Sequence, residues 1–198
     1  CRYFIRISGG ESPSHLCAEC AVETQPTLVL IPEEIEHLKM GIIALTHLIA
    51  DVVEIRANSG LHYGVVLLPD SLLESVPEMH TVITEIDNCF AEGIGFQQND
   101  EELAFLQSHL TPWSAAFFSS LPREIQKQLA FNRDQTDKVD LTSIDTEILL
   151  KRMVETELAR RKSIGTFKKG AFFCKTHFLA YQGRSALPSN FDCDLGYV

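Results

Sequence analysis

Residues 64–71 read GVVLLPDS, a short apolar run that ends at a Pro-Asp-Ser turn. Two runs of similar character come before it, RYFIRI at 2–7 and TLVLI at 27–31, and prolines bound the second of these. Apolar, β-branched runs of this length between turn residues are typical of buried strands. We therefore expect three strands in this part of the chain.

Helices are expected between these strands. A Ser-Pro pair at 12–13 supplies an N-cap and a proline at the first helical position, and the helix should continue to about Thr24. Residues 42–58 carry a wide apolar stripe, with Gly60 just past their end. This order predicts an α/β fold in which helices flank a mostly parallel sheet. Ligands bind beyond the carboxyl ends of strands in such sheets, and Asp70 stands at such an end.

After this point the chain reads as mostly helical. Pro112 and Pro122 each stand at an expected helix start, and the polar residues 132–140 are typical of a loop. Residues 143–162 have the period of a long amphipathic helix. This helical excess interrupts the alternation of strands and helices, and it predicts an inserted helical subdomain at residues 90–165.

The bulk properties narrow the class of protein. A chain of 198 residues with 45% hydrophobic and 22% charged residues can form one lobe, and we expect that lobe to be 1–198. A net charge of -10 without a basic stripe argues against nucleic acid as a partner. No apolar run is long enough to cross a bilayer, so no membrane partner is expected. The start at Cys1, with no initiator Met and no leader, indicates a piece of a longer polypeptide.

Six cysteines are present, and two of them form a C-x-x-C at Cys17 and Cys20. No second pair follows at the spacing of a zinc site, and the i, i+3 spacing places both thiols on one helix face. We interpret them as buried thiols in a reducing compartment, ahead of a redox or metal site. The expected location is therefore cytoplasmic.

The last strand is expected at 172–181, within a region where residues 176–192 read THFLAYQGRSALPSNFD. The strand runs into Tyr181, breaks at Gly183 and presents Arg184. A planar, permanently charged fork at a strand end suits bidentate binding of a phosphate. Taken alone, Arg184 could also be a solvated loop residue and Tyr181 a core aromatic.

Side chains alternate along this strand, so Lys175, His177 and Tyr181 share one face. Lys175 and Tyr181 would lie about 20 Å apart and cannot both touch one small phosphate. We therefore interpret Lys175 as an interface or solvated residue, and His177 as a packed, hydrogen-bonded histidine.

Four segments, in the right order, resemble pyrophosphate-dependent phosphofructokinases of the long, plant and protist type. Residues 176–192 are similar to the G-Y-x-G-R motif that closes the family's site, and 64–78 are similar to its G-V-I-L-I-P-E-G-L-I-E-x-I-P-E. Residues 110–129 resemble its helical insertion, and 4–21 resemble the segment around its M-G-R motif. The resemblance covers nearly the whole chain and implies the second, fructose 6-phosphate-binding lobe of such an enzyme.

The resemblance also implies substrate contacts. Tyr181 and Arg184 would grip the 6-phosphate of fructose 6-phosphate. Asp70 takes the place of the family's Glu and would hold sugar hydroxyls, while Ser71 replaces a Gly. The Pro-Asp-Ser sequence alone would be only a helix N-cap, so both interpretations of Asp70 stay open.

The Met-Gly-Arg motif is where the resemblance fails. One alignment puts it on Ser8, Gly9 and Gly10, and the other puts it on Gly9, Gly10 and Glu11. The Arg is absent in both, and in the second it is replaced by an acid that would repel a phosphorylated sugar. The glycines remain, so a backbone loop at a helix start could still bind an anion.

The family moves a phosphoryl group from pyrophosphate to the 1-hydroxyl of fructose 6-phosphate, with Mg²⁺. Its G-G-D-D and T-I-D-G-D segments belong to the first lobe and do not occur in this chain. The resemblance therefore implies that an N-terminal lobe is a partner and binds most of the Mg²⁺. Phosphoryl transfer needs donor, metal and acceptor positioned together, so no catalytic residue is expected here and the chain alone should be inactive.

An oligomer is implied by the resemblance as well. The donor motif is not in this chain, so pyrophosphate and ATP both stay open as donors. The main alternative is a degenerate, non-catalytic half or subunit with a structural or regulatory role, which the lost Arg and the altered P-E-G favour. A plain interaction module without a ligand ranks last.

Overall fold

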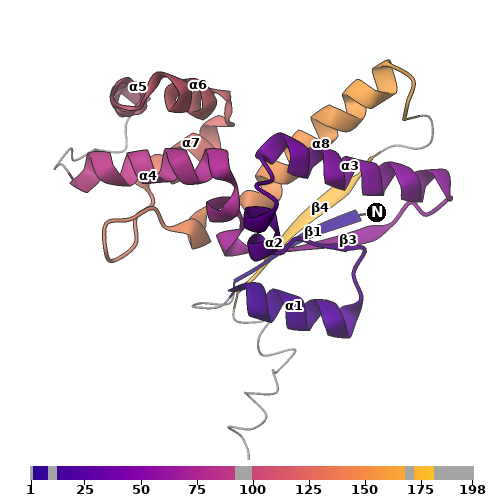
Figure 1. The fold of residues 1–198 in the computed structure, drawn as a ribbon. Coiled ribbons are helices and arrows are strands. Elements are labelled where there is room, and N and C mark those ends of the chain that lie inside the picture. The colour runs from indigo at the N-terminus through magenta and orange to yellow at the C-terminus, as the bar shows by residue number, and fades with distance from the viewer. Residues whose placement is uncertain (1, 9–12, 92–99, 168–171, 181–198) are drawn as a thin grey trace, which may run out of the picture.

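The fold is that of a computed structural model, which describes residues 2–8, 13–91, 100–167 and 172–180. Its centre is a four-stranded sheet in the order β2-β3-β1-β4, and every pair of neighbouring strands is parallel (Figure 1). The expected α/β class with a parallel sheet is confirmed. The strands are β1 (Arg2–Ile7), β2 (Leu28–Val29), β3 (Gly64–Pro69) and β4 (Cys174–Leu179).

Two strands are shorter than the sequence predicts. The run at 27–31 pairs regularly only over Leu28–Val29, although backbone bonds to β3 flank this pair on both sides. The run at 172–181 forms strand over Cys174–Leu179. Prolines at 26 and 32 bound β2, and proline cannot donate to the ladder, which limits its length.

The register brings three chain positions to one edge of the sheet. Ile7 in β1 lies opposite Pro69 in β3 and opposite Leu179 in β4. The next residue of each strand therefore leaves the sheet at the same end, and the N–H of Ser8 still donates to the carbonyl of Leu179 at 2.9 Å. We call this end the carboxyl edge.

One face of the sheet is covered by α1 (Pro13–Thr24), which begins at the expected Ser-Pro signal (Figure 1). Its buried residues Leu16, Cys17 and Cys20 form a small core with Ile7 and Leu67. The interpretation of the C-x-x-C as buried thiols is confirmed. Burial raises the pKa of Cys17 to about 12, so this thiol is a poor nucleophile at neutral pH.

The other face is covered by α3 (Ile42–Asn58) and α8 (Thr146–Ser163), which pack against each other (Figure 1). Most of the buried apolar side chains lie on this side. A short helix that the sequence analysis did not predict, α2 (Pro32–His37), leads into α3. With six residues it is too short to show a helical period, and its sequence signals are the Pro at N1 and the acids Glu33 and Glu34 in the first turn.

The segment between β3 and β4 is helical, as predicted. A 3₁₀-helix, η1 (Asp70–Ser75), follows β3 directly, at the Pro-Asp-Ser turn. Pro112 begins a helix as predicted, and Pro122 is the residue before one. The remaining elements are α4 (Pro77–Ala91), α5 (Asp100–His109), α6 (Pro112–Ser120), α7 (Arg123–Phe131) and the 3₁₀-helix η2 (Leu141–Ser143). None of the helices in the described ranges has an apolar stretch long enough to cross a membrane.

The helix α8 differs from the other helices of this segment in what it contacts. Helices α5, α6 and α7 pack with one another and with α4, to one side of the sheet (Figure 1). In contrast, α8 contacts α3, β1 and β4, and so it forms part of the layer on the sheet. The limits of 90–165 for an inserted subdomain stay a prediction.

Candidate functional site: a polar cluster at the carboxyl edge

The carboxyl edge contains a topological switch point between β1 and β3. The chain leaves β1 through α1 on one face, and it leaves β3 toward the helical segment and α8 on the other face (Figure 1). Neighbouring parallel strands whose connections leave to opposite faces frame a crevice, and ligands of α/β sheets bind there. Ser8 follows β1 and Asp70 follows β3 at this point.

Asp70 is almost fully buried, with 3% of its surface exposed. Burial raises the pKa of its carboxyl, against the Ser8 hydroxyl, the charge of Arg6 and the N–H of Ser71, which all favour the ionised form. Its Oδ2 atom has no hydrogen-bond partner among the described residues. A buried acceptor without a donor costs folding free energy, so this oxygen is suited to accept a hydrogen bond from a hydroxyl of a ligand.

The structure does not support the alternative that Asp70 is only a helix cap. Pro69, not Asp70, occupies the capping position of η1, and no side chain makes a capping hydrogen bond there. Asp70 is the first residue of the 3₁₀-helix itself. Its free oxygen therefore has no capping role in the described part of the chain.

Arg6 lies beside this carboxylate and is 2% exposed. Its Nε atom lies 2.6 Å from Oε2 of Glu147, and its Nη1 donates to the carbonyl of Thr142 at 2.5 Å. Its Nη2 lies 3.5 Å from Oδ1 of Asp145, and its guanidinium lies over the Phe178 ring at 4.1 Å from the centroid. The guanidinium is therefore held on several sides by groups from η2, α8 and β4.

The acids around Arg6 are themselves held in place. Asp145 accepts a hydrogen bond from Nε2 of Gln128 at 2.7 Å, and its N–H donates to Oε1 of the same side chain at 2.9 Å. Glu147 is buried, and burial raises the pKa of its carboxyl. We call the group of Arg6, Ser8, Asp70, Asp145 and Glu147 the edge cluster.

Sequence reasoning found Asp70 but missed the other charged members of this cluster. A signal for Arg6 was present, since a charged residue stands between apolar neighbours in a strand that is buried on both faces. A buried charge needs a partner, so the position itself predicts an acid elsewhere in the chain. The identity of that acid, Glu147, could not be predicted, because about 140 residues separate the two.

Four of the predicted site residues, Gly9, Gly10, Tyr181 and Arg184, lie outside the described residues. The described structure does bring together the positions that lead into them. Ser8 precedes the glycines and Ala180 precedes the tyrosine, and the register places Ser8 between Asp70 and Ala180 at the carboxyl edge. The roles of these four residues stay predictions.

The other residues singled out on the last strand lie on β4. Lys175 is exposed, in agreement with its interpretation as an interface or solvated residue. His177 is exposed rather than packed in the core, although its ring stacks on that of Tyr3 at a centroid distance of 5.5 Å. The reason is that β4 is an edge strand, and α1 contacts the other three strands more closely. Within the described ranges, no group of three or more His, Cys, Asp or Glu could hold a metal ion.

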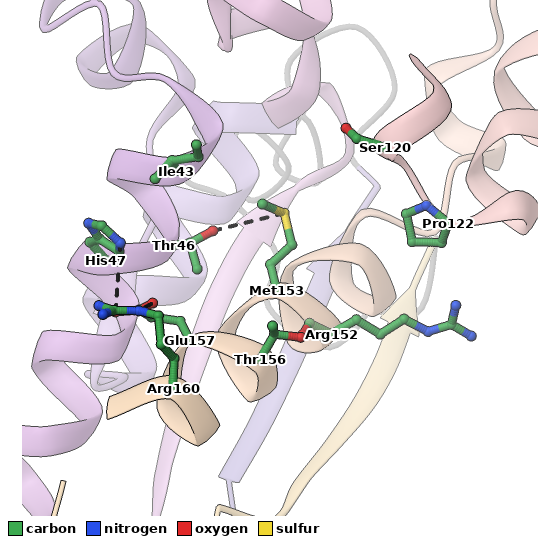
Figure 2. A pocket seen from close by; sticks show the side chains of 10 residues that line it. All are labelled: Ile43, Thr46, His47, Ser120, Pro122, Arg152, Met153, Thr156, Glu157 and Arg160. Atoms are coloured by element: carbon green, nitrogen blue, oxygen red, sulfur yellow. Dashed lines mark hydrogen bonds and ion pairs between the residues drawn. The ribbon is translucent and has the colours of Figure 1, made fainter. Parts of the chain in front are cut away.

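A pocket of about 340 Å³ lies elsewhere, between α3, α8 and the corner where α6 meets α7 (Figure 2). We call it the α3–α8 pocket. Glu157 in its wall accepts two hydrogen bonds from Arg160, at 2.7 and 2.8 Å, and one from Arg161 at 2.8 Å. These bonds lower the pKa of Glu157 to about 2. The lining residues are Ile43, Thr46, His47, Ser120, Pro122, Arg152, Met153, Thr156, Glu157 and Arg160.

The polar groups of this pocket already bond to one another. Figure 2 shows the Thr46 hydroxyl directed at the sulfur of Met153, at 3.9 Å, and His47 directed at Glu157, at 3.7 Å. Arg152 forms an exposed ion pair with Glu124 at 3.0 Å. The pocket is hollow, but its charged side chains in the described structure are paired.

Comparison with known proteins bears directly on the resemblance. No protein-family model matches the chain. It is 38% identical over 196 residues to the α subunit of pyrophosphate–fructose 6-phosphate 1-phosphotransferase from Solanum tuberosum, covering 99% of this chain and 30% of that protein. It is 39% identical over 196 residues to the β subunit from the same plant, with coverages of 99% and 33%. The enzyme of the same name from Treponema pallidum is 38% identical over 200 residues, with coverages of 99% and 35%.

The chain thus spans about a third of the length of the curated relatives it matches. The identity is similar for α subunits, β subunits and a protein named without a subunit, so it does not favour one of them. The resemblance that the motifs indicated is confirmed: over 99% of its length, this chain is similar to about a third of the length of the pyrophosphate–fructose 6-phosphate 1-phosphotransferases, at 38–39% identity.

Proposed function

We propose that this chain is the substrate-binding lobe of a pyrophosphate-dependent phosphofructokinase, which transfers a phosphoryl group from pyrophosphate to fructose 6-phosphate in glycolysis. The names of the relatives support this activity for the whole protein. In the proposed complex the Asp70 carboxylate accepts hydrogen bonds from sugar hydroxyls. Tyr181 and Arg184 hold the 6-phosphate, and the backbone at Gly9 and Gly10 lines the same crevice.

The observation that carries the proposal is the buried Oδ2 of Asp70. It lies at a switch point of a parallel sheet, and no donor reaches it among the described residues. A sugar hydroxyl would supply that donor, and a hydrogen bond to a charged acceptor contributes about 1.5–3 kcal/mol. The proximity of Ser8 and Ala180 supports a site to which all three predicted motifs contribute.

The proposal assigns the remaining chemistry to other parts of a longer protein. Phosphoryl transfer is mostly positioning and charge neutralisation, so the donor, Mg²⁺ and the acceptor must be held together. We propose that an N-terminal lobe binds pyrophosphate and most of the Mg²⁺, and that this chain alone is inactive. The α and β subunits among the relatives support an oligomer.

The test is to replace Arg184 by Ala in the full-length protein and to measure the affinity for fructose 6-phosphate. Loss of a charge-assisted contact should weaken binding about ten- to a hundredfold. Lys175→Ala is the matched control, because it also removes a cation from this region but lies near the start of β4, away from the carboxyl edge. Equal affinities in the wild type and Arg184→Ala would reduce Arg184 to a loop residue.

The alternative function is a non-catalytic, structural or regulatory subunit of the same enzyme. Two observations favour it: the Arg of the family's M-G-R motif is absent, and an Asp replaces the longer Glu of P-E-G. Gly10→Arg or Glu11→Arg in the full-length protein should restore a bidentate donor, and one of them should tighten fructose 6-phosphate binding about tenfold. If neither changes affinity or activity, this loop is remote from the ligand.

A further inference from the structure

Arg6 joins the sheet to the turn that precedes α8. It stands in β1, one of the two inner strands, two residues before Ser8, and its guanidinium contacts Thr142, Asp145 and Glu147. These three residues come from η2, from the turn after it and from the first turn of α8. Arg6 is therefore the described side chain that ties the end of β1 to this turn.

The burial of this ion pair makes stability a poor explanation for it. Removing a guanidinium and a carboxylate from water costs free energy that their attraction does not always recover, and well-packed apolar residues are often as stable. A buried ion pair with a hydrogen bond to a backbone carbonyl does, however, define one geometry. Since Arg presents a rigid planar fork, it fixes that geometry more tightly than Lys would.

The geometry that Arg6 fixes includes the candidate sugar-binding carboxylate. Ile7 lies opposite Pro69, so Ser8 and Asp70 are the next pair along the two strands, and the Ser8 hydroxyl is among the groups that favour the ionised form of the Asp70 carboxyl. The η1 helix that begins at Asp70 also packs against η2, to which Arg6 is bonded. Both paths from Arg6, through β1 and through η2, lead to Asp70.

We propose that Arg6 is a positioning residue for substrate binding. Through its contacts with Glu147 and Thr142 it holds Ser8 and η1 in place. The Asp70 carboxylate is thereby positioned to accept hydrogen bonds from hydroxyls of the sugar phosphate. The inference rests on the proposed function for the identity of the ligand. The positional part, that Arg6 sets the place of Ser8 and Asp70, does not depend on that identity.

The chain offers a matched control in Arg133. Its Nη1 lies 2.7 Å from Oδ1 of Asp87, and its guanidinium lies 3.6 Å from the centroid of the Phe90 ring. Arg133 therefore combines an ion pair and an aromatic contact, as Arg6 does. Asp87 is ten residues along α4 from its start, or about 15 Å of helix away from η1. Loss of the Arg133 contacts should not be felt at Asp70.

The experiment compares Arg6→Lys, Glu147→Gln and Arg133→Lys in the full-length protein. We expect Arg6→Lys and Glu147→Gln to raise KM for fructose 6-phosphate about tenfold, since small displacements of positioning groups have large effects. KM for pyrophosphate should stay within about twofold, because the donor is bound elsewhere. Arg133→Lys should change neither value.

Hydrogen exchange of the free protein gives a second measurement that does not involve activity. Amides of η1 should exchange faster in Arg6→Lys and Glu147→Gln than in the wild type, whereas Arg133→Lys should leave them unchanged. If Arg6→Lys fails to fold, Glu147→Gln carries the same comparison, because it keeps the volume of the acid and removes its charge.

The two kinds of failure can be told apart. A fall in kcat with both KM values unchanged, or faster exchange spread over the whole molecule in all three variants, would overturn the positioning role. If the wild type does not bind fructose 6-phosphate at all, the proposed function is wrong. In that case the exchange of η1 still decides whether Arg6 positions Asp70.

Discussion

The edge cluster and the wall of the α3–α8 pocket are both built from acids and arginines, but the pKa values of their buried acids are shifted in opposite directions. In the wall, Glu157 is matched by Arg160 and Arg161, and hydrogen bonds lower the pKa of its carboxyl to about 2. In the edge cluster, burial raises the pKa of Asp70 and of Glu147. The pocket is hollow with its charges paired, whereas the edge retains a buried acceptor without a donor in the described chain.

This difference shows why volume alone is a weak guide to a ligand site. A group whose hydrogen bonds are made inside the protein gains little from a ligand, because binding must first break them. A buried oxygen without a donor gains a full hydrogen bond when a ligand supplies one. The carboxyl edge therefore has more to gain from a ligand than the α3–α8 pocket has.

The largest expected effect is that of removing the acid from the edge cluster. Glu147→Ala leaves the buried guanidinium of Arg6 without its nearest acid, and such a loss typically costs about 3–5 kcal/mol of unfolding free energy. Urea unfolding of the purified protein measures it. Glu124→Ala is the matched control at the rim of the α3–α8 pocket, where the pair with Arg152 is exposed and its loss should be hard to detect. Similar changes in both variants would show that Arg6 is not desolvated.

Sequence patterns predicted the parts of the fold that depend on local chemistry. The strand at 2–7, the helices at 13–24 and 42–58 and the helix start at Pro112 follow from apolar period, caps and proline positions, and the structure confirms them. The six-residue helix α2 was not predicted, and neither was the 3₁₀ type of η1, because both elements are too short to show a period.

The long helix α8 shows a different limit. Ile148 and Met153 belong with Val154 to the apolar period of residues 143–162, but both are only half-buried. Buried instead are Leu149 and Leu150, because α8 is enclosed by α3 on one side and by the sheet on another. A helix with two buried sides has no single stripe, so its contacts cannot be read from one period.

The candidate site was predictable only in part for a similar reason. Asp70 was found through its place after a strand and through the family resemblance. The contacts of Arg6 depend on residues 136 and 139 positions away in the chain, and no local pattern encodes such pairs. The register that sets Ser8 beside Asp70 is likewise a property of the assembled sheet.

A smaller expected effect is on the pH dependence of the unfolding free energy, which should differ between variants in the two regions. Glu157 titrates near 4.5 in the unfolded chain and near 2 in the folded one, so the unfolded chain takes up a proton first as the pH falls. Its contribution to the unfolding free energy is therefore present above pH 4.5 and is lost between pH 4.5 and about 2. After allowance for solvent screening, Glu157→Gln should cost about 1 kcal/mol near neutral pH, and its difference from the wild type should shrink in acid.

Glu147 should show the opposite sign. Its pKa is higher in the folded protein, so the folded state takes up the proton first and the wild type gains unfolding free energy as the pH falls through that raised pKa. The unfolding free energy of the wild type minus that of Glu147→Gln should therefore rise toward acid, whereas the same difference for Glu157→Gln should fall. Urea unfolding at several values between about pH 7 and pH 3 measures both differences. Two variants that change in the same direction would contradict the contrast between the regions.

The smallest expected effect is on substrate binding, when a cation of the α3–α8 pocket is removed. Arg160→Ala in the full-length protein should leave KM for fructose 6-phosphate within about twofold of the wild type, because changes at distant sites without shared partners act independently. The guanidinium of Arg160 is bonded to Glu157, and Arg161 still holds that acid when Arg160 is removed. A phosphate would have to displace Glu157 before it could use Arg160, whereas the acceptor oxygen of Asp70 is free of such competition among the described residues. A tenfold or larger rise in KM would mean that the pocket, and not the carboxyl edge, binds the sugar phosphate.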